Sequence, residues 1–384
     1  MQIGILTGGG DVPGLNPCIK AITRAAISRG WDVIGFRRGW AGPLNYNPDN
    51  PEASEDRILR LDAERVRTID RRGGTILHTS RTNPGRVKPN ALPEFLKGKF
   101  RAGDKGTIDC TSHVLRVFET LGVDAMFAIG GDDTLSYAAH LHRQGMKMMA
   151  LPKTMDNDVF GTDYCIGFST AVSRSLELME ALRSPAGSHE RIAVVELFGR
   201  NSGETALISG YLADADRTLI AEAPIDVGRL AELVAKDRAA NPSNYAIVAV
   251  SEGAQLESGE IVETGPEDAY GHRKLGGIGE IIGNQLEKLT GIGILNQKLG
   301  YLMRAGPPDA MDRMVSMNYG TMAVQLLDEG KHGLMMAIRE GKYTTVPGDT
   351  SIKGKRRVDV PALYDTREYR ARIDRILGKP VFLY

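Results

Sequence analysis

Cysteine is scarce in this chain, and long apolar runs are missing. The three cysteines, Cys18, Cys110 and Cys165, stand far apart in 384 residues. This argues against a disulfide framework or a zinc site and favours the reducing cytoplasm. No apolar stretch approaches the roughly 20 residues that a membrane-spanning helix requires. The first residues, MQIGILTGGG, lack the basic and long apolar segments of a signal peptide. We therefore expect a cytoplasmic protein that does not enter a membrane.

An excess of charge is also missing. The 48 lysine and arginine residues equal the 48 aspartate and glutamate residues, so charge gives no reason to expect binding to nucleic acid or to a membrane surface. Hydrophobic residues make up 42% of the chain, as in ordinary globular proteins. The length of 384 residues suggests two domains or one large one.

What the chain does contain is a strand–helix–strand pattern in its middle. The apolar runs at 125–129 and 148–151 are too short for stable helices and suit buried strands. Residues 134–143 between them are typical of a helix, and such a unit favours parallel strands with a right-handed crossover. Ligands of open α/β sheets bind beyond the carboxyl ends of the strands. The polar loops GGDDT and PKTMDND, which follow these strands, are therefore the candidate site.

The two loops carry residue types that phosphoryl transfer requires. Asp132 and Asp133 can hold a hard cation such as Mg²⁺, and Lys153 suits a phosphate. Asp156 and Asp158 offer a general base and a partner carboxylate. Aspartate, asparagine and glycine are also ordinary turn and cap residues. Their combination at successive strand ends nevertheless indicates phosphoryl transfer.

Taken together, the loops resemble the phosphofructokinase family. ATP-using bacterial members usually read GGDGS and PGTIDND, and further matches are scattered from Ile3 to about Ala323. Asp133 and Lys153 each replace a glycine of that pattern, which resembles the pyrophosphate-dependent 6-phosphofructokinases. The resemblance implies reversible transfer of a phosphoryl group from pyrophosphate to the 1-hydroxyl of fructose 6-phosphate. This reaction of glycolysis gives fructose 1,6-bisphosphate and phosphate.

The resemblance also implies a fold and a division of the chain. We expect an α/β protein with two Rossmann-like lobes, mainly parallel sheets and the active site between the lobes, which is the phosphofructokinase fold. Residues 1–167 plus 305–330 would form the phosphoryl-donor lobe, and 168–304 the sugar-phosphate lobe. Residues 331–384 would form a C-terminal extension that wraps the subunit or covers the site. The basic run at 353–357 within it is expected to be a solvated face.

The family's functional residues carry over to matching positions of this chain. Asp132 would anchor Mg²⁺, Asp156 would act as the base, and Lys153 and Arg200 would be the other catalytic residues. The donor-binding positions are Gly10, Arg81, Gly131, Asp133 and Thr134. The substrate-binding positions are Thr154, Met155, Asp158, Arg191, Phe198, Gly199, Glu252, Tyr301 and Arg304.

A homo-oligomer is implied as well. Arg191 matches an arginine that family members supply to the neighbouring subunit's sugar-phosphate site. Leu295 replaces a second such arginine, and Lys298 could compensate for it. Both a homodimer and a homotetramer stay open.

The choice of donor depends on Asp133. In ATP-using relatives the backbone at this position lies close to the nucleotide's ribose and α-phosphate, so a side chain here takes up space. Its charge would also repel the α-phosphate, since two unit charges about 4 Å apart interact by roughly 4 kcal/mol at an effective dielectric constant near 20. Pyrophosphate ends where the α-phosphate would begin, and Lys153 can neutralise its leaving phosphate.

Three alternatives stay open at this point. The nearest is an ATP-dependent 6-phosphofructokinase. The second is a lipid or NAD kinase, whose glycine-rich loop contains GGDGT but which lacks the PKTMDND and FGRNSG segments found here. The third is a non-enzymatic two-lobed sugar-binding protein, which would need no carboxylate base beside a cation site.

Overall fold

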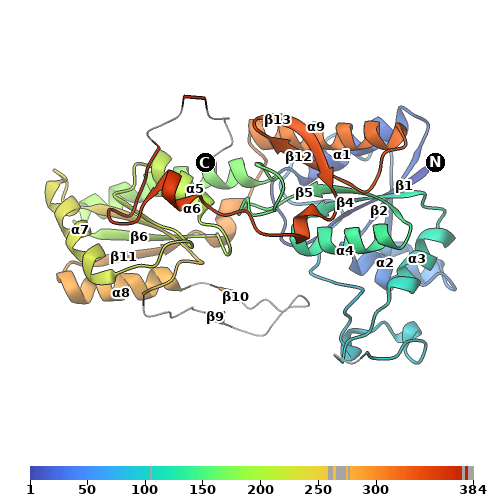
Figure 1. The fold of residues 1–384 in the computed structure, drawn as a ribbon, viewed down its shortest axis with the longest axis horizontal. Helices are drawn as coiled ribbons and strands as arrows, with labels where there is room; N and C mark the ends of the chain where they lie inside the picture. The colour runs from blue at the N-terminus through green and yellow to red at the C-terminus, as the bar shows by residue number, and fades with distance from the viewer. Residues whose placement is uncertain (104–105, 258–262, 265–273, 276, 374–376, 379–384) are drawn as a thin grey trace.

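The computed structural model describes residues 1–103, 106–257, 263–264, 274–275, 277–373 and 377–378, and it forms two α/β lobes side by side (Figure 1). The last residues of the expected extension, 379–384, lie outside the described residues. The predicted α/β fold with mainly parallel sheets is confirmed. Within the described ranges no helix is both long and apolar enough to cross a membrane.

The first lobe is built on a seven-stranded sheet with the strand order β13-β12-β5-β4-β1-β2-β3. The strands in chain order are β1 Gln2–Thr7, β2 Asp32–Phe36, β3 Ile58–Leu61, β4 Ala125–Gly130, β5 Lys147–Pro152, β12 Leu334–Arg339 and β13 Lys342–Pro347. The pairs from β2 through β1, β4 and β5 to β12 are parallel, and the two edge strands β3 and β13 pair antiparallel. The two strands β12 and β13 come from the segment that was expected to be an extension.

Helices cover both faces of this sheet, which explains why its central strands are apolar throughout. On β4, alternate residues contact different cores: Phe127 packs with α1 and α9, whereas Met126 packs with α3 and α4. The helices of this lobe are α1 Leu15–Ile27, α2 Ala41–Asn45, α3 Thr111–Thr120, α4 Asp132–Arg143 and α9 Ala310–Asp328. Short 3-10 helices lie in its loops: η1 Glu52–Arg57, η2 Ile69–Arg71, η3 Pro89–Ala91, η4 Glu94–Leu96 and η6 Thr350–Ile352.

The second lobe has a four-stranded parallel sheet in the order β11-β6-β8-β7. Its strands are β6 Ile192–Leu197, β7 Arg217–Leu219, β8 Ala246–Ser251 and β11 Ile294–Lys298. Its helices are α5 Phe168–Ser188, α6 Glu204–Leu212, α7 Val227–Ala240 and α8 Ile278–Thr290, followed by the 3-10 helix η5 Gly300–Arg304. The remaining short elements are β9 Glu263–Thr264, β10 Lys274–Leu275, α10 Val360–Leu363, β14 Tyr364–Asp365 and β15 Arg370–Ala371.

A buried carboxylate joins the first lobe to the helix that enters the second. Asp312 of α9 accepts hydrogen bonds from the backbone N–H of Gly167, at 2.7 Å, and of Thr170, at 2.8 Å, at the start of α5. It also accepts hydrogen bonds from the hydroxyls of Thr170 and Tyr164. The free N–H groups at a helix start are thus satisfied by an acidic side chain from another helix. One continuous hydrophobic cluster runs through both lobes around this junction.

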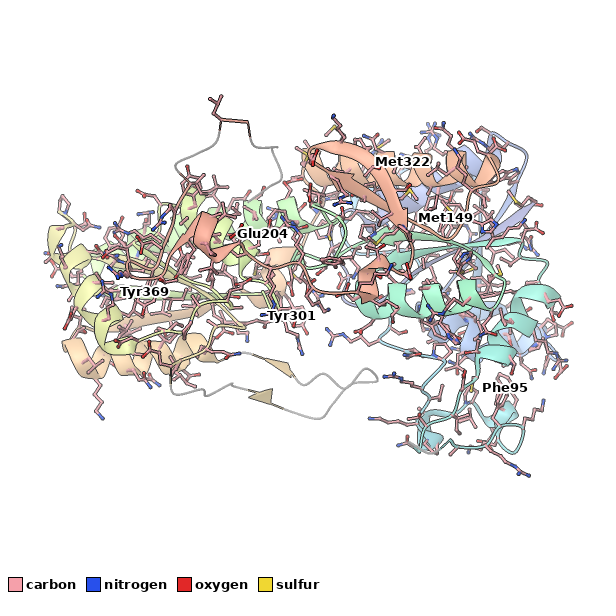
Figure 2. The ribbon with its side chains drawn as sticks, in the orientation of Figure 1. Phe95, Met149, Glu204, Tyr301, Met322 and Tyr369 are labelled. Atoms are coloured by element: carbon pink, nitrogen blue, oxygen red, sulfur yellow. The ribbon has the colours of Figure 1, made fainter. Side chains whose placement is uncertain are left out.

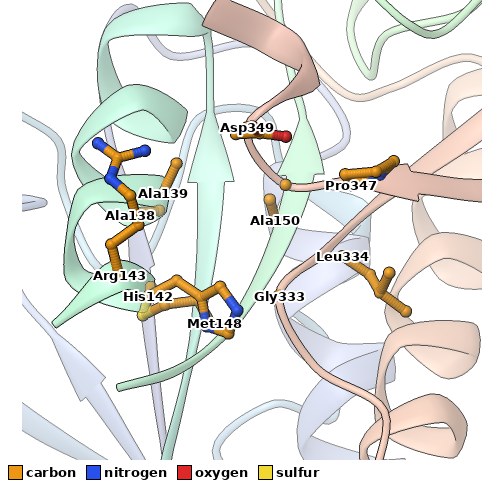
Figure 3. A pocket seen from close by; sticks show the side chains of 11 residues that line it. Ala138, Ala139, His142, Arg143, Met148, Ala150, Gly333, Leu334, Pro347 and Asp349 are labelled. Atoms are coloured by element: carbon orange, nitrogen blue, oxygen red, sulfur yellow. The ribbon is translucent and has the colours of Figure 1, made fainter. Parts of the chain in front are cut away.

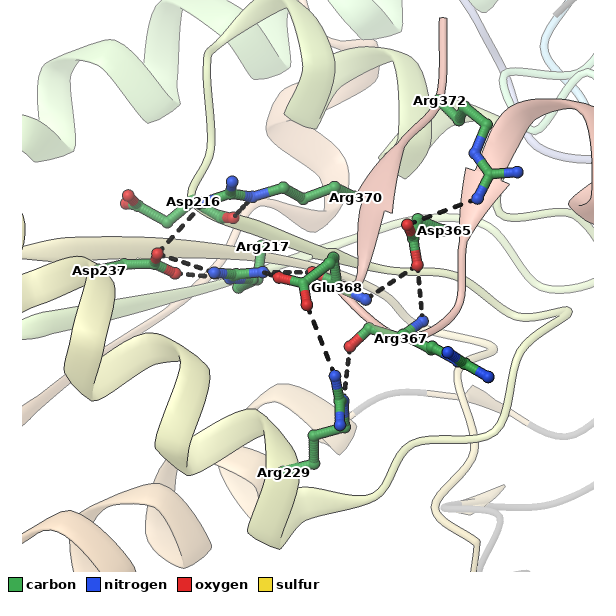
Figure 4. Close-up of polar contacts among 9 residues, drawn as sticks. All are labelled: Asp216, Arg217, Arg229, Asp237, Asp365, Arg367, Glu368, Arg370 and Arg372. Carbon is green, nitrogen blue, oxygen red and sulfur yellow. Dashed lines mark hydrogen bonds and ion pairs between the residues drawn. The ribbon is translucent and has the colours of Figure 1, made fainter.

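After β13 the chain leaves the first lobe, and its elements α10, β14 and β15 lie on the second (Figure 1). Arg217 of β7, which is 2% exposed, holds it there through a hydrogen bond to the Glu368 carboxylate at 2.9 Å (Figure 4). Asp237 of α7 fixes the same guanidinium from within the second lobe, at 2.5 and 2.8 Å. Leu363, Tyr364 and Tyr369 of the same segment join the core of the second lobe. The C-terminal segment is therefore a packed strap between the lobes.

Candidate active site

The two loops singled out by the sequence begin side by side. β4 and β5 pair parallel with Gly130 opposite Pro152, so the loops that follow them leave the sheet at the same edge. A cavity at this edge takes residues from both lobes and from the C-terminal segment. Its lining consists of Gly9, Gly10, Arg81, Gly131, Asp132, Asp133, Thr134, Lys153, Thr154, Asp156, Asp158, Arg200, Asn201 and Lys355.

Positively charged side chains line one side of the cavity, next to the glycine-rich loop after β1. Lys153, only 3% exposed, donates a hydrogen bond from Nζ to the carbonyl oxygen of Gly10 at 2.5 Å. Burial, together with the neighbouring Arg304 and Arg81, lowers the pKa of Lys153 to about 8, although Asp11 opposes this. Glycine at position 10 leaves room for the Arg304 guanidinium, which a Cβ there would push aside. An anion bound at this corner would replace the repulsion between these cations with attraction.

The opposite side of the cavity is acidic. Asp132 and Asp133 occupy the first turn of α4, where the helix dipole favours negative charge. One oxygen of Asp132, Oδ2, pairs with the ammonium of Lys355, while the buried Oδ1 has no hydrogen-bond partner in the described part of the chain. Burial and the nearby Asp158 raise the pKa of Asp132 to about 7, against the opposing effect of Lys355.

This acidic side suits a hard divalent cation. The partnerless Oδ1 of Asp132 is a buried oxygen ligand, and Asp158 is close enough to act on Asp132 electrostatically. Among the described residues, no group of three or more histidine, cysteine, aspartate or glutamate side chains forms a ready-made metal site. A cation here would therefore take its other ligands from phosphate oxygens and water, which is how Mg²⁺ is usually bound.

Between the two sides lies the candidate base. Asp156 is half-buried, and its Oδ2 accepts a hydrogen bond from the backbone N–H of Arg200 at 3.3 Å. Its own N–H donates to the Thr154 hydroxyl at 3.2 Å. Burial and the neighbouring Asp158 raise the pKa of Asp156 to about 7. A carboxylate that titrates near neutral pH can both accept and return a proton.

Polar contacts join the second lobe to the loop after β5, which carries Asp156. Asn201 donates from Nδ2 to Asp158 Oδ2 at 3.0 Å. Thr205 donates to the carbonyl oxygen of Met155 at 2.7 Å, and the Met155 side chain is buried in the core. Glu204 of α6, which lies between the lobes (Figure 2), accepts from Asn157 Nδ2 at 3.1 Å. The loop that carries the base is therefore held from both lobes.

The remaining sugar-side positions form a second cluster. The Arg304 guanidinium lies 4.6 Å from the centre of the Tyr301 ring and 5.9 Å from that of Phe198. Tyr301 is 67% exposed near the junction of the lobes (Figure 2). Gly199 has a φ of 147°, which favours glycine, and a Cβ there would collide with Ser251.

Arg304 and Glu252 link this cluster to the cavity. Arg304 Nη1 donates to the carbonyl oxygen of Asp11 at 3.3 Å, beside Gly10 of the cavity lining. Glu252 follows β8, and burial and the nearby Asp156 raise its pKa to about 8.

Arg191 is the one predicted position at the far end of its strand. It precedes β6, whereas Phe198 and Arg200 follow the carboxyl end of the same strand. Its side chain is exposed. Within one chain it does not join the cavity.

The sequence analysis missed Asn201 and Lys355, and its prediction of a solvated basic run is wrong for Lys355 and Arg356. Lys355 lines the cavity, and the Arg356 guanidinium pairs with the buried Glu204. Asn201 lies inside the FGRNSG segment, so that motif could have revealed it. For Lys355 the sequence offers no local signal.

A second cavity lies along the C-terminal half of α4 and does not share these properties (Figure 3). Alanine, glycine, leucine, methionine and proline make up most of its lining, and its polar side chains are His142, Arg143 and Asp349. His142 already shares a hydrogen bond of 3.0 Å with the carbonyl oxygen of Met146. No predicted residue lines this cavity, so we place the site at the strand ends.

Comparisons with known proteins show the family and the fold of this chain. A family model described as phosphofructokinase matches residues 2–327. The pyrophosphate–fructose 6-phosphate 1-phosphotransferase of Amycolatopsis methanolica is 40% identical over 341 residues, covering 88% of this chain and 91% of that protein. The ATP-dependent 6-phosphofructokinase of Chloroflexus aggregans is 37% identical over 346 residues, covering 90% of this chain and 89% of that protein. The crystal structure of pyrophosphate-dependent phosphofructokinase from Marinobacter aquaeolei superposes with a TM-score of 0.76 at 18% identity, covering 97% of this chain and 89% of that one, which shows the fold alone.

Proposed function

The chain belongs to the phosphofructokinase family, and we propose that it uses pyrophosphate as its phosphoryl donor. It is a phosphotransferase that moves a phosphoryl group reversibly from pyrophosphate to the 1-hydroxyl of fructose 6-phosphate, with fructose 1,6-bisphosphate and phosphate as products. Membership of the family decides against the lipid or NAD kinase and the sugar-binding protein. Relatives named for pyrophosphate and for ATP are 40% and 37% identical, so the donor has to be argued from the site.

The observation that carries the choice of pyrophosphate is the presence of Asp133 and Lys153 in one cavity. Asp133 adds volume and negative charge at the start of α4, next to Asp132. A third phosphate beyond the pyrophosphate unit would meet that carboxylate. Even a third of the roughly 4 kcal/mol between two charges about 4 Å apart is close to tenfold in affinity. Lys153 adds a buried cation for the leaving phosphate.

Each residue of the cavity then has a place in the reaction. Lys153 and Arg81 would bind the donor's oxygens beside the glycine loop, and Arg200 would stabilise charge on the transferred group. Asp156 would take the proton from the 1-hydroxyl, for which a pKa of about 7 is well suited. In the reverse direction the protonated Asp156 would return the proton to that oxygen.

The cofactor we propose is Mg²⁺, which Asp132 would hold. When bound, the metal would supply positive charge that neutralises the oxygens of pyrophosphate. The supporting observation is the buried Asp132 Oδ1, which has no hydrogen-bond partner in the described ranges.

On the sugar side, Arg304 would bind the 6-phosphate and Glu252 a sugar hydroxyl. Arg304 already lies between the Tyr301 ring and the loop after β1. With a pKa of about 8, Glu252 keeps its proton at neutral pH before substrate binds, so it can donate as well as accept a hydrogen bond.

The assembly we propose is a homodimer or homotetramer in which Arg191 completes the sugar-phosphate site of the neighbouring subunit. Its exposure, at the end of β6 away from its own cavity, supports this. A cytoplasmic location stays a prediction from the sequence.

A coupled assay on fructose 6-phosphate, run in parallel with pyrophosphate and with ATP, tests the proposed function. We expect turnover with pyrophosphate and a kcat/KM for ATP at least about tenfold lower. A preference for ATP would favour the ATP-dependent alternative.

A further inference from the structure

Lys355 reaches the candidate active site from the C-terminal segment. The chain leaves β13 in the first lobe, and Lys355 then bridges Val159 antiparallel, directly after the loop that carries Asp156 and Asp158. The backbone N–H of the next residue, Arg356, donates to the carbonyl oxygen of Asp158 at 2.9 Å. The strap therefore runs along one wall of the cavity, and Lys355 belongs to its lining.

Two carboxylates of the second lobe fix the strap at this place. The Arg356 guanidinium pairs with Glu204, a buried residue that also binds Asn157. The N–H of Val358 donates to Glu222 Oε1 at 3.0 Å, and the same carboxylate accepts from the N–H of Gly203. Gly203 ends the loop that contains Arg200. These two anchors, which follow Lys355 closely in the chain, thus set its distance from the cavity.

The ammonium of Lys355 faces negative charge from the first lobe. It pairs with Asp132 Oδ2, and its side chain is 38% exposed against 14% for Asp132. The ammonium is therefore held beside the carboxylate that we propose as the Mg²⁺ ligand.

Binding of Mg²⁺ and pyrophosphate would change the groups that surround the Lys355 ammonium. A divalent cation on Oδ1 of Asp132 would compete with the ammonium, which pairs with Oδ2, for the charge of that carboxylate. The lysine head is mobile on its four-carbon stem, and the phosphate that the cation holds would be a new anion beside it, in the cavity that Asp133 and Asp158 also line. Lys153 and Arg81 line the glycine side of the cavity, so Lys355 would contact the donor from the opposite wall.

We infer that Lys355 is a further donor-binding residue, which the C-terminal strap delivers to the oxygens of pyrophosphate when Mg²⁺ occupies Asp132. The inference rests on the proposed function, because it takes pyrophosphate as the donor. It adds a third part of the chain to the site, after the loops of the two lobes.

The test measures binding without turnover. Pyrophosphate with Mg²⁺ is titrated calorimetrically into the full-length protein in the absence of fructose 6-phosphate, for the parent and for Lys355→Met and Lys355→Gln. A hydrogen bond between charged groups contributes enough for us to expect a Kd about tenfold to a hundredfold higher in both variants. The matched control is Lys353→Met, which removes a lysine two residues away that pairs with Asp349 at 3.1 Å on the surface. Its Kd should change less than about threefold.

The outcomes separate the inference from the proposed function. A parent that does not bind pyrophosphate overturns the proposed function. A parent that binds it, with Lys355 variants as tight as Lys353→Met, overturns the role of Lys355 alone. Tighter binding in the Lys355 variants also overturns that role, since Lys355 would then only compete with the metal. Melting temperatures show which of the two Lys355 variants folds like the parent. One variant that does so is enough for the test.

Discussion

The ammonium of Lys153 and the carbonyl oxygen of Gly10 lie 2.5 Å apart, although β4 separates their strands in the sheet. Lys153 follows β5 and reaches across the end of β4 to the loop that follows β1. The contact joins three successive strand ends into one surface, with Asp132 at the start of α4 between them. A phosphate at this surface would meet a cation that is already in position, so little side-chain ordering would be needed on binding.

The role of Asp156 predicts a loss of rate rather than of binding. Asp156→Ser should lower kcat by about 10² to 10⁴, the usual range for a general base. The KM for fructose 6-phosphate should change far less, because the base acts mainly in the transition state. Steady-state kinetics check this, with Asp328→Ser as a control that removes a half-exposed carboxylate paired with Arg29. A near-normal kcat in the Asp156 variant would remove that residue from the role.

The donor argument predicts different effects for Asp133 and Lys153. Asp133→Gly should improve kcat/KM for ATP by about tenfold or more, since the blocking charge and volume are lost. Lys153→Gly should lower kcat/KM for pyrophosphate without admitting ATP, because Asp133 remains. The double variant should shift the preference most, since residues that share a site rarely act additively.

The kcat/KM values for both donors in the parent and the three variants decide this prediction. A parent that uses only pyrophosphate while Asp133→Gly gains nothing with ATP would leave the function in place and remove the steric explanation. Lys97→Gly, which removes an exposed lysine that pairs with Glu94, serves as a control for a general loss of charge.

The fold and most of the site could be predicted because their signals are local. Two short apolar runs separated by a helix are enough to predict that the GGDDT and PKTMDND loops share an edge, and Gly130 does pair with Pro152. The resemblance to the phosphofructokinase family predicted the site residues that lie far from these loops in the sequence. Arg304, for example, lies 293 residues along the chain from Asp11, to whose carbonyl oxygen it donates.

The place of Lys355 in the cavity could not be predicted from the sequence. Its partner Asp132 is 223 residues earlier in the chain, and a basic run looks the same in sequence whether it is solvated or paired. The decisive contact is the neighbouring pair Arg356 and Glu204, which is buried only because the strap crosses between the lobes. No periodicity or motif encodes that path. The same holds for β12 and β13, whose place beside β5 depends on tertiary packing.

The perturbed groups predict a narrow pH optimum for kcat/KM. Asp156 must be ionised to accept a proton, and its pKa is raised to about 7, so activity should be lost as the pH falls through about 7. Lys153 must be charged to bind phosphate, and its pKa is lowered to about 8, so activity should be lost as the pH rises through about 8. The pH profile of kcat/KM for pyrophosphate checks both limbs.

Lys153→Arg tests the assignment of the alkaline limb. Arginine stays charged throughout the accessible pH range, so the alkaline loss should move to higher pH even if overall activity falls. An unchanged alkaline limb in Lys153→Arg would mean that another group titrates there.

The position of Arg191 predicts that one subunit can complete another. Arg191→Ala should raise the KM for fructose 6-phosphate by about tenfold to a hundredfold, the loss expected for one charged hydrogen bond. Asp156→Ser should be inactive for a different reason, since it lacks the base but keeps Arg191.

Co-expression of these two variants is the decisive measurement. In a symmetric dimer each site would take its base from one subunit and Arg191 from the other. A mixed dimer of the two variants then contains one intact site, because the Arg191→Ala subunit keeps its base and receives an arginine from its partner. Random pairing should restore about a quarter of parental activity at low fructose 6-phosphate. If Arg191 acted within its own chain, no combination of the variants would contain an intact site, and the mixture would be no more active than the average of its parts.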